Sequence, residues 1–251
     1  ETSANLVYIS LINSLHYKWA IKSLNQNKHL IIDKPITLSL NHTKKIIKLA
    51  SKKKLFISEA IVFDKHAQFK KMFALINLNK KTTITSDFHI PKLDINNFRN
   101  FNKFGGGCFQ DMSPYASSII KLFFNNSKYS TKTRKIKNSK GIVESFRLEA
   151  KSKNIFLKSS FSFNRSYKNQ IKILNQNKKY FISYAFSPPV NKTLQLEVFD
   201  EINNKNYKIR FNKQNVFLTY FKLVFSIIRM KKYNFFYKEI MNNAEIKKKI
   251  S

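Results

Sequence analysis

From Leu6 to Phe63 the chain alternates apolar runs of strand length with amphipathic segments, and this alternation constrains the fold more than any other feature. The apolar runs are Leu6–Ile12, His29–Asp33 and Leu55–Phe63. Runs of this kind are typical of strands that are buried on both faces. The helical segments between them complete a βαβαβ pattern, which predicts a parallel sheet. Right-handed crossovers place both helices on one face of that sheet.

Beyond these runs the chain consists mainly of short strand-like segments, several of which alternate apolar with polar residues. Such alternation is typical of an antiparallel sheet with one face in water. A helical segment that begins at Cys108 interrupts the strands, and two more follow at about 216–230 and 235–249. We therefore expect an α/β plus α+β fold. Residues 1–63 form part of a Rossmann-type domain, and residues 64–251 form a larger, mostly antiparallel sheet domain with flanking helices.

The chain is strongly basic, with 47 basic and 14 acidic residues and a formal charge of +33. A positive field of this size attracts polyanions such as nucleic acids or anionic membranes. The basic residues are mostly lysines scattered along a chain that is also rich in Asn, Ile and Phe, which is typical of a base-composition bias in the genome. We favour that bias over a specific nucleic-acid site, because nucleic-acid binders concentrate arginine and aromatic residues on one face.

The single cysteine, Cys108, excludes a disulfide framework and favours a reducing, cytoplasmic location. No run of ~18 apolar residues predicts a membrane span. The most apolar stretch begins at Asn215 and is interrupted by Lys222 and Arg229. We expect it to pack on its own domain rather than to lie on a membrane surface as a basic amphipathic helix.

Polar residues follow each of the three predicted strands. Asn13 follows the first, Asp33 and Lys34 follow the second, and Glu59 lies near the end of the third. The carboxyl ends of parallel strands meet at the edge where α/β sheets bind ligands, so we expect these side chains to gather there. Loops are polar in any case, and the spacing alone leaves both interpretations open.

Three of the four glycines in the chain form the triplet Gly105-Gly106-Gly107. Glycine costs backbone entropy, so a triplet in a glycine-poor sequence predicts tight geometry or the close approach of another group. A helix is expected to begin just after it, with Asp111 and Tyr115 on one face. A tyrosine beside a lysine is a workable proton donor, because the cation lowers the pKa of the hydroxyl. A capped helix with a core tyrosine is the alternative.

The stretch VYISLINSLHYKWAIKSLNQNKHLIIDKP, together with the later GGGCFQDMSPY, resembles the Gfo/Idh/MocA oxidoreductase family. In that family a strand leads to Asn and His, then to a helix and to a strand that ends in Glu-Lys-Pro. The resemblance covers nearly the whole chain and is closest to the sugar-nucleotide ketoreductases, because of Tyr115. It implies hydride transfer between NAD or NADP and a carbon that bears oxygen on a sugar or sugar nucleotide.

The resemblance also implies a role for each matching residue. Lys34 matches the lysine that stabilises charge on the reacting oxygen, Tyr115 matches the acid/base, and Asp111 would orient the site. The implied cofactor-binding residues are Ser10, Asn13, His16, Asp33, Lys34 and Pro35. The implied substrate-binding residues are Glu59 and His66. We expect no metal site, a sugar or nucleotide-sugar substrate, and a homo-oligomer formed through the sheet domain.

Some residues depart from the family pattern. Asp33 replaces the usual Glu, Asp64 stands where many relatives have Arg, and Ser113 replaces a common Gly. The largest departure is the absence of a GxGxxG turn, which holds the cofactor pyrophosphate. Because a βαβ unit takes ~30 residues, we expect the nucleotide-binding half before Leu6 to be missing and the chain alone to be inactive or weakly active.

Three hypotheses remain, in this order. The first is a fragment of an NAD(P)-dependent oxidoreductase that acts on sugars or sugar nucleotides. The second is a non-catalytic relative that serves as a binding or oligomerisation module. The presence of Asp64, where many relatives have Arg, favours this hypothesis. The third is a polyanion-binding protein driven by its charge of +33.

Overall fold

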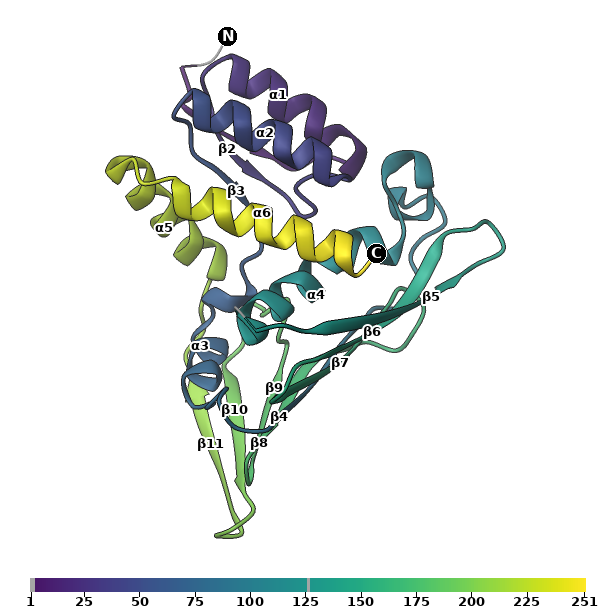
Figure 1. The fold of residues 1–251 in the computed structure, drawn as a ribbon, viewed down its shortest axis with the longest axis vertical. Coiled ribbons are helices and arrows are strands. Elements are labelled where there is room, and N and C mark those ends of the chain that lie inside the picture. The colour runs from purple at the N-terminus through teal and green to yellow at the C-terminus, as the bar shows by residue number, and fades with distance from the viewer. Residues whose placement is uncertain (1–2, 126) are drawn as a thin grey trace.

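The computed structural model of the chain describes residues 3–125 and 127–251. The fold contains two sheets of different size, which are separated by a layer of helices (Figure 1). The smaller sheet is parallel and lies near the N-terminus, and the larger sheet is almost entirely antiparallel. The expected combination of a partial Rossmann-type sheet and a larger antiparallel sheet is confirmed.

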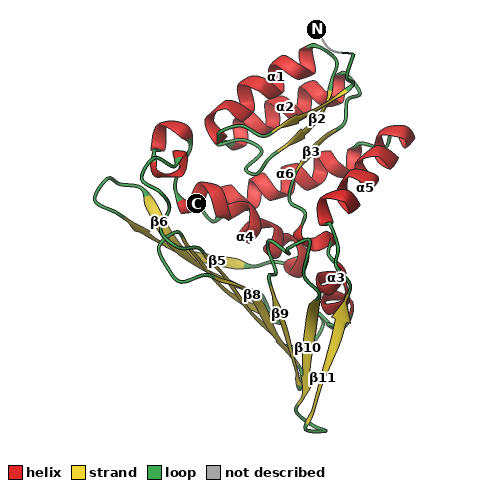
Figure 2. Ribbon diagram, turned by 180° about the vertical axis from the view of Figure 1, so that it is seen from behind, coloured by secondary structure: helices red, strands yellow, loops and turns green. Residues whose placement is uncertain are grey.

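The small sheet has three parallel strands in the order β1–β2–β3. They are β1 (Leu6–Ile9), β2 (His29–Ile32) and β3 (Ile57–Glu59). The short helix η1 (Asn13–Leu15) and the helices α1 (His16–Asn25) and α2 (Leu40–Lys52) connect them. Figures 1 and 2 show α1 and α2 side by side on one face, as right-handed crossovers require. The predicted βαβαβ arrangement is therefore present.

The opposite face of the small sheet is covered by the two C-terminal helices, α5 (Val216–Met230) and α6 (Asn234–Lys249) (Figure 1). Tyr220 of α5 and Phe236 of α6 are buried in the same apolar cluster as the three strands. We expected residues 64–251 to form one domain, whereas these contacts place the C-terminal helices with the N-terminal sheet. The reason is that the second face of the sheet is as apolar as the first and needs its own cover.

The large sheet has eight strands in the order β11-β10-β9-β8-β4-β7-β6-β5. In chain order they are β4 (Thr82–His89), β5 (Ser130–Lys137), β6 (Val143–Lys151), β7 (Ile155–Ser162), β8 (Lys168–Asn175), β9 (Lys178–Ser183), β10 (Leu194–Asp200) and β11 (Lys205–Phe211). Only the β4–β7 pair is parallel. Burial alternates along β8, as expected for a sheet with one covered face.

The covered face of the large sheet packs against α3 (Ala67–Ala74) and α4 (Cys108–Phe124) (Figure 2). Helix α4 also packs on α6, so it joins the two sheets. The short helices η2 (Phe63–Lys65), η3 (Phe98–Asn100) and η4 (Asn102–Phe104) lie in the connections. No helix in the described part of the chain is both long enough and apolar enough to cross a bilayer.

Candidate active site

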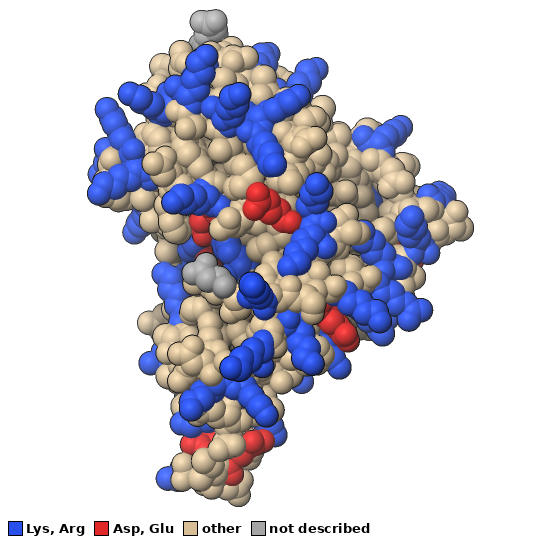
Figure 3. Space-filling view, in the orientation of Figure 1, with Lys and Arg blue, Asp and Glu red and all other residues tan. Residues whose placement is uncertain are grey.

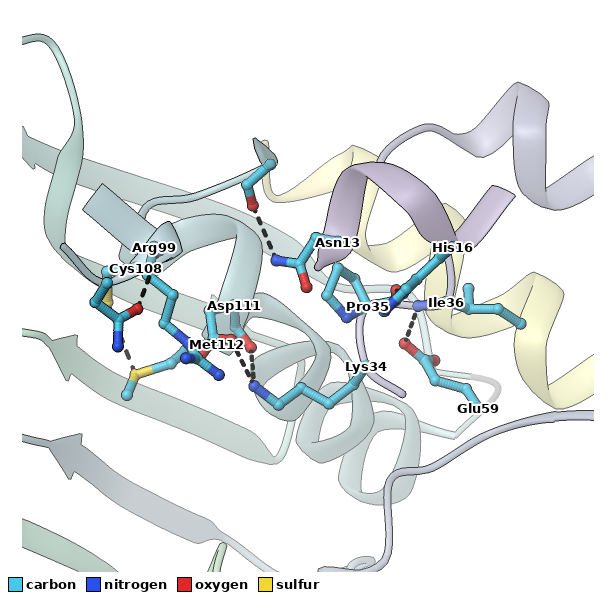
Figure 4. Close-up of polar contacts among 12 residues, drawn as sticks. Asn13, His16, Lys34, Pro35, Ile36, Glu59, Arg99, Cys108, Asp111 and Met112 are labelled. Atoms are coloured by element: carbon cyan, nitrogen blue, oxygen red, sulfur yellow. Dashed lines mark hydrogen bonds and ion pairs between the residues drawn. The ribbon is translucent and has the colours of Figure 1, made fainter. Parts of the chain in front are cut away.

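Lys34 lies just after the carboxyl end of β2, where the Lys34–Pro35 peptide bond is cis. Its side chain reaches α4, where Nζ lies 2.9 Å from Oδ1 of Asp111 and 2.9 Å from the backbone oxygen of the same residue (Figure 4). Burial by itself lowers the pKa of Lys34, but the charge and hydrogen bond of Asp111, together with Tyr115, outweigh burial and hold that pKa above its usual value. Lys34 is therefore a charged group in a fixed position at the edge of the small sheet.

The carboxylate of Asp111 is held between two cations. Its Oδ1 also accepts a hydrogen bond of 3.0 Å from Nε of Arg99. The side chain of Asp111 is 8% exposed, so burial favours protonation, but Lys34 and Arg99 outweigh burial and keep its pKa below the usual range. A buried carboxylate that contacts both cations fixes the position of each, in line with the orienting role expected of Asp111.

The glycine triplet holds the Arg99 loop against the start of α4. The backbone N–H of Gly107 donates to the carbonyl oxygen of Arg99 at 2.7 Å, and that of Gly106 donates to Phe101 at 3.1 Å. A Cβ at Gly106 would lie 2.4 Å from the Arg99 oxygen, and Gly107 has a φ of +93°. The tight backbone geometry that the triplet predicts is therefore present, and it positions Arg99 beside Asp111.

This geometry gives a prediction for Gly106→Ala. We expect a loss of about 2 kcal/mol in the free energy of unfolding, because the new methyl group meets the backbone oxygen of Arg99. Gly141→Ala is the matched control, since a Cβ there meets nothing within 4 Å. Because Gly141 has a φ of +73°, Gly141→Ala is expected to cost about 1 kcal/mol through backbone strain alone. Urea unfolding measures both variants, and equal losses would contradict the steric explanation.

A cavity of about 620 Å³ opens beside Lys34, and we call it the Lys34 cavity. Its lining comes from the carboxyl edge of the small sheet, from α4, and from the segment after β9: Ser10, Leu11, Ile12, Asn13, Asp33, Lys34, Ala60, Val62, Phe98, Arg99, Tyr115, Phe186, Ser187, Pro188, Val216 and Phe217. Small-molecule sites in proteins usually enclose ~300–1,000 Å³. The Lys34 cavity is thus large enough for an organic ligand.

Tyr115 lies one helical turn after Asp111 and lines the same cavity. The centre of its ring is 5.3 Å from Nζ of Lys34, and the ring also contacts Phe88 and Phe186. Lys34 does act to lower the pKa of this tyrosine, as expected, but its effect is not the largest one. Burial raises the pKa of Tyr115 above its usual value and outweighs the attraction of Lys34. Its hydroxyl is therefore protonated at neutral pH, as a proton donor requires.

Three of the expected cofactor-binding residues line the Lys34 cavity beside Lys34 itself: Ser10, Asn13 and Asp33. Nδ2 of Asn13 donates a 2.9 Å hydrogen bond to the backbone oxygen of Gly105, so it ties the small sheet to the glycine triplet. Asp33 accepts a hydrogen bond from the hydroxyl of Tyr8. Of the strand-end residues, Asn13, Asp33 and Lys34 therefore gather at one edge, as the sequence predicts, whereas Glu59 does not.

The two expected histidines do not line this cavity. His16 is fully buried, with Nδ1 2.8 Å from the backbone oxygen of Pro35 and Nε2 2.9 Å from that of Leu11. It braces the turn that carries Lys34 instead of facing a ligand. His66 is also fully buried, and its Nδ1 accepts a 3.2 Å hydrogen bond from the backbone of Gln68 at the start of α3.

Glu59 and Pro35 line a different cavity, behind the Lys34–Pro35 turn. Oε1 of Glu59 accepts a 2.9 Å hydrogen bond from the backbone of Ile36, and Figure 4 shows this contact on the other side of the turn from Asp111. Neighbouring residues of a strand point to opposite faces, so Ala60 lines the Lys34 cavity whereas Glu59 does not. Glu59 and Pro35, expected to contact substrate and cofactor, therefore line a different cavity from Lys34.

Two parts of the site had not been identified from the sequence. Arg99 could have been found, because it is one of few arginines in a lysine-rich chain and lies shortly before the glycine triplet. Phe186 and its neighbours carry no local motif and reach the cavity only through the path of the chain after β9. In residues 3–125 and 127–251 no group of three or more His, Cys, Asp or Glu side chains is placed to hold a metal ion.

Residues 1–60 match the sequence model of the GFO_IDH_MocA family, described as an oxidoreductase family with an NAD-binding Rossmann fold. The chain is 27% identical over 121 residues to the uncharacterized oxidoreductase ORF334 of Rhizobium meliloti, an alignment that covers 47% of this chain and 36% of the relative. It is 28% identical over 120 residues to the dTDP-3,4-didehydro-2,6-dideoxy-alpha-D-glucose 3-reductase of Saccharopolyspora spinosa, with the same two coverages, 47% and 36%. The matched region is thus about a third of each relative.

Solved structures share the fold along nearly the whole chain. A mutant 3-ketoreductase from Actinomadura kijaniata, in complex with TDP-benzene and NADP, superposes with a TM-score of 0.90 at 15% identity, over 99% of this chain and 78% of the other. An aldose-aldose oxidoreductase from Caulobacter crescentus, complexed with glycerol, gives a TM-score of 0.85 at 12% identity, over 98% and 76%. The structures confirm the fold class predicted from the sequence, and the match of residues 1–60 bears out the family resemblance over that stretch.

Proposed function

Because residues 1–60 match the sequence model of an NAD-binding oxidoreductase family, we propose that the Lys34 cavity is the catalytic crevice of an NAD(P)-dependent oxidoreductase. The substrate is a ketone or hydroxyl group of a sugar or sugar nucleotide. The observation that carries this proposal is the arrangement at Lys34. A charged ammonium group, held by the buried Asp111, lies 5.3 Å from the ring centre of a protonated Tyr115 in one cavity.

The lining of the cavity fits a nicotinamide, which combines a flat, largely apolar ring with one amide group. Leu11, Ile12 and Val62 provide apolar surface, and Ser10 and Asn13 provide polar groups. The nicotinamide, when bound, supplies or accepts the hydride. The chain contains no GxGxxG turn, so the proposal assigns no pyrophosphate contact to its residues and expects the chain alone to bind the dinucleotide weakly.

In the direction of ketone reduction, the residues of the chain act on the substrate oxygen. Lys34 donates a hydrogen bond to the carbonyl oxygen and stabilises the negative charge that develops there as the carbon accepts hydride. Tyr115 then transfers its hydroxyl proton to that oxygen, which completes the alcohol. Asp111 keeps Lys34 charged and fixes its position, while Arg99 shares the same carboxylate at the edge of the cavity.

The names of the similar proteins identify the first substrate to test. Among the relatives is a reductase of a dTDP-linked keto sugar, and one structural neighbour holds TDP-benzene and NADP. We expect the chain to oxidise NADPH slowly when a dTDP-linked 3-keto sugar is added, with formation of the 3-hydroxy sugar detected by mass spectrometry. No product at saturating NADPH would reject the catalytic proposal in favour of a non-catalytic binding module.

Tyr115→Phe tests the proton donor. We expect about a 10²-fold lower rate of ketone reduction, because the hydroxyl that protonates the substrate oxygen is gone. Burial raises the pKa of Tyr115 above its usual value, so in the native chain the donor stays protonated and the rate should not fall between pH 7 and pH 9 through this group. A rate that falls over that range in the native chain, but not in Tyr115→Phe, would contradict the assignment.

We also propose that the chain forms a homo-oligomer through the large sheet. In the described residues no helix covers the outer face of this sheet (Figure 2). Leu174 is 38% exposed there, close to Phe181 on the neighbouring strand, and both lie on the face turned away from α4. Light scattering on the purified chain measures the oligomeric state, and a monomer at high concentration would contradict this proposal.

The charge of the chain offers little support for a nucleic-acid site. Figure 3 shows Lys and Arg side chains spread over the whole visible face, above both sheets, and not gathered into one stripe. Dispersed charge attracts polyanions only weakly and without preference. We therefore propose no nucleic-acid partner, and elution from heparin at low salt is the expected result.

A further inference from the structure

Two tyrosines and a lysine from separate parts of the chain lie together on the large-sheet domain, and we call Tyr167, Tyr184 and Lys192 the Tyr167 cluster. The ring centres of the two tyrosines are 6.3 Å apart, and Nζ of Lys192 donates a 3.0 Å hydrogen bond to the hydroxyl of Tyr184. Tyr167 comes just before β8, Tyr184 just after β9 and Lys192 just before β10. Nothing in the proposed reaction uses these three side chains.

A single buried side chain connects the Tyr167 cluster to the wall of the Lys34 cavity. Asn169 is 5% exposed, and its Nδ2 donates to the hydroxyl of Tyr167 at 3.1 Å and to that of Ser187 at 2.9 Å. Ser187 lines the Lys34 cavity. Oδ1 of Asn169 accepts a 2.8 Å hydrogen bond from the backbone of Phe186, which can only donate, so the orientation of the amide is defined. The cluster is therefore held in a fixed position at the edge of the cavity.

The cluster presents an aromatic surface next to a cation. The side chain of Tyr167 is 50% exposed, so part of its ring is open to a ligand. Tyr184 has a φ of +50°, a left-handed conformation that is costly for a bulky residue and that occurs mainly at functional sites. The hydrogen bond to Tyr184 and the proximity of both tyrosines raise the pKa of Lys192 above its usual value, so Lys192 is charged at neutral pH.

These groups discriminate between classes of ligand. A simple anion would pair with Lys192 but would make no use of the exposed ring, and an apolar molecule would cover the ring without pairing with the lysine. A nucleotide uses both, because its base stacks on an aromatic ring and its phosphates bind a cation. In a sugar nucleotide the sugar and the base are at opposite ends, so a sugar that reacts at Lys34 directs its nucleotide out of the cavity.

We propose that the Tyr167 cluster is the nucleotide subsite of the substrate, in which the base stacks on Tyr167 and Lys192 binds the diphosphate. The position of Ser187 supports this assignment, because its hydroxyl lines the cavity and shares one amide nitrogen with the hydroxyl of Tyr167. The inference rests on the proposed function, since it takes the reacting sugar to lie in the Lys34 cavity.

Calorimetry and saturation-transfer NMR test this subsite with dTDP as the probe, and with thymidine and inorganic pyrophosphate as its two halves. We expect the native chain to bind dTDP and Tyr167→Ala to weaken that binding about tenfold, as loss of one base–aromatic stack does. Tyr167→Phe keeps the ring and should bind dTDP nearly as well as the native chain. Lys192→Met should weaken the binding of dTDP but not that of thymidine.

Tyr207→Ala is the matched control. Tyr207 is 43% exposed, lies on β11 and does not line the Lys34 cavity, so this variant should bind dTDP as the native chain does. Thermal unfolding of each variant checks that it is folded.

The outcome does not depend on the turnover assay. Binding of dTDP that is weakened in Tyr167→Ala and kept in Tyr167→Phe and Tyr207→Ala supports the subsite, even if the chain reduces no keto sugar, a result that rejects only the catalytic proposal. Binding that Tyr167→Ala leaves unchanged overturns the subsite, even if turnover is observed. No binding of dTDP by the native chain, or binding of pyrophosphate as tight as that of dTDP, which marks a simple anion site, also overturns it.

Discussion

Lys34→Met is expected to lower kcat for ketone reduction about 10³-fold, while the protein remains folded. The substitution removes the donor aimed at the substrate oxygen, and the loss of one such donor typically costs ~10²–10³-fold in rate. We expect the upper end of this range because the substitution also removes the positive charge that Asp111 holds in place. Turnover of a dTDP-linked 3-keto sugar with NADPH measures the effect.

Lys65→Met is the control for this experiment. Lys65 forms a 2.7 Å ion pair with Asp64, next to it in the chain, and does not line the Lys34 cavity. The substitution Lys65→Met therefore removes a lysine and an ion pair without changing the proposed site, and turnover by this variant should match that of the native chain. Equal losses of turnover in Lys34→Met and Lys65→Met would show that the position of Lys34 beside the cavity does not matter for turnover.

Asp111→Asn is expected to lower the free energy of unfolding by about 3 kcal/mol at neutral pH. Breaking a buried ion pair by removing one partner typically costs ~3–5 kcal/mol, because the remaining charge is left without compensation. The lower end applies, since Arg99 is 30% exposed and water screens part of its charge. Urea unfolding measures the loss, and Lys121→Met, which breaks the 2.7 Å ion pair with Glu239 on α6, is the comparison.

The pH dependence of this loss has a definite sign. The pKa of Asp111 is lower in the folded chain than in the unfolded chain, so its stabilising effect is present above the unfolded value and is lost as the pH falls through the folded value. The pKa of Lys34 is raised, so its contribution is lost as the pH rises above its usual range. The difference in free energy of unfolding between the native chain and Asp111→Asn should therefore be largest near neutral pH and become smaller in acid. A difference that does not change with pH would contradict the ion-pair account.

The first half of the site could be predicted because it depends on a regular rule. Consecutive parallel strands end at one edge, so Asn13, Asp33 and Lys34 were expected to lie close together once the βαβαβ pattern was recognised. Asp111 and Tyr115 followed from helical spacing after the glycine triplet. These inferences need only local periodicity and the order of elements.

The remaining features depend on tertiary packing, which local patterns do not encode. The raised pKa of Tyr115 comes from its burial beside Phe88 and Phe186, two residues that lie far from it in the chain. The orientation of Glu59 depends on which face of β3 it occupies, and the three-residue length of β3 leaves that phase undefined in the sequence. The C-terminal helices were placed with the wrong sheet, since an amphipathic helix does not specify which apolar surface it covers.

The most direct test of the central claim follows deuterium from NADPH that carries it at C4 of the nicotinamide. The native chain should transfer the deuterium to the carbon that was the ketone of a dTDP-linked 3-keto sugar, as detected by mass spectrometry and NMR of the product. In Lys34→Met this transfer should fall about 10³-fold. Absence of deuterium from the product of the native chain, or equal transfer by Lys34→Met, would contradict the assignment of the Lys34 cavity as a hydride-transfer site.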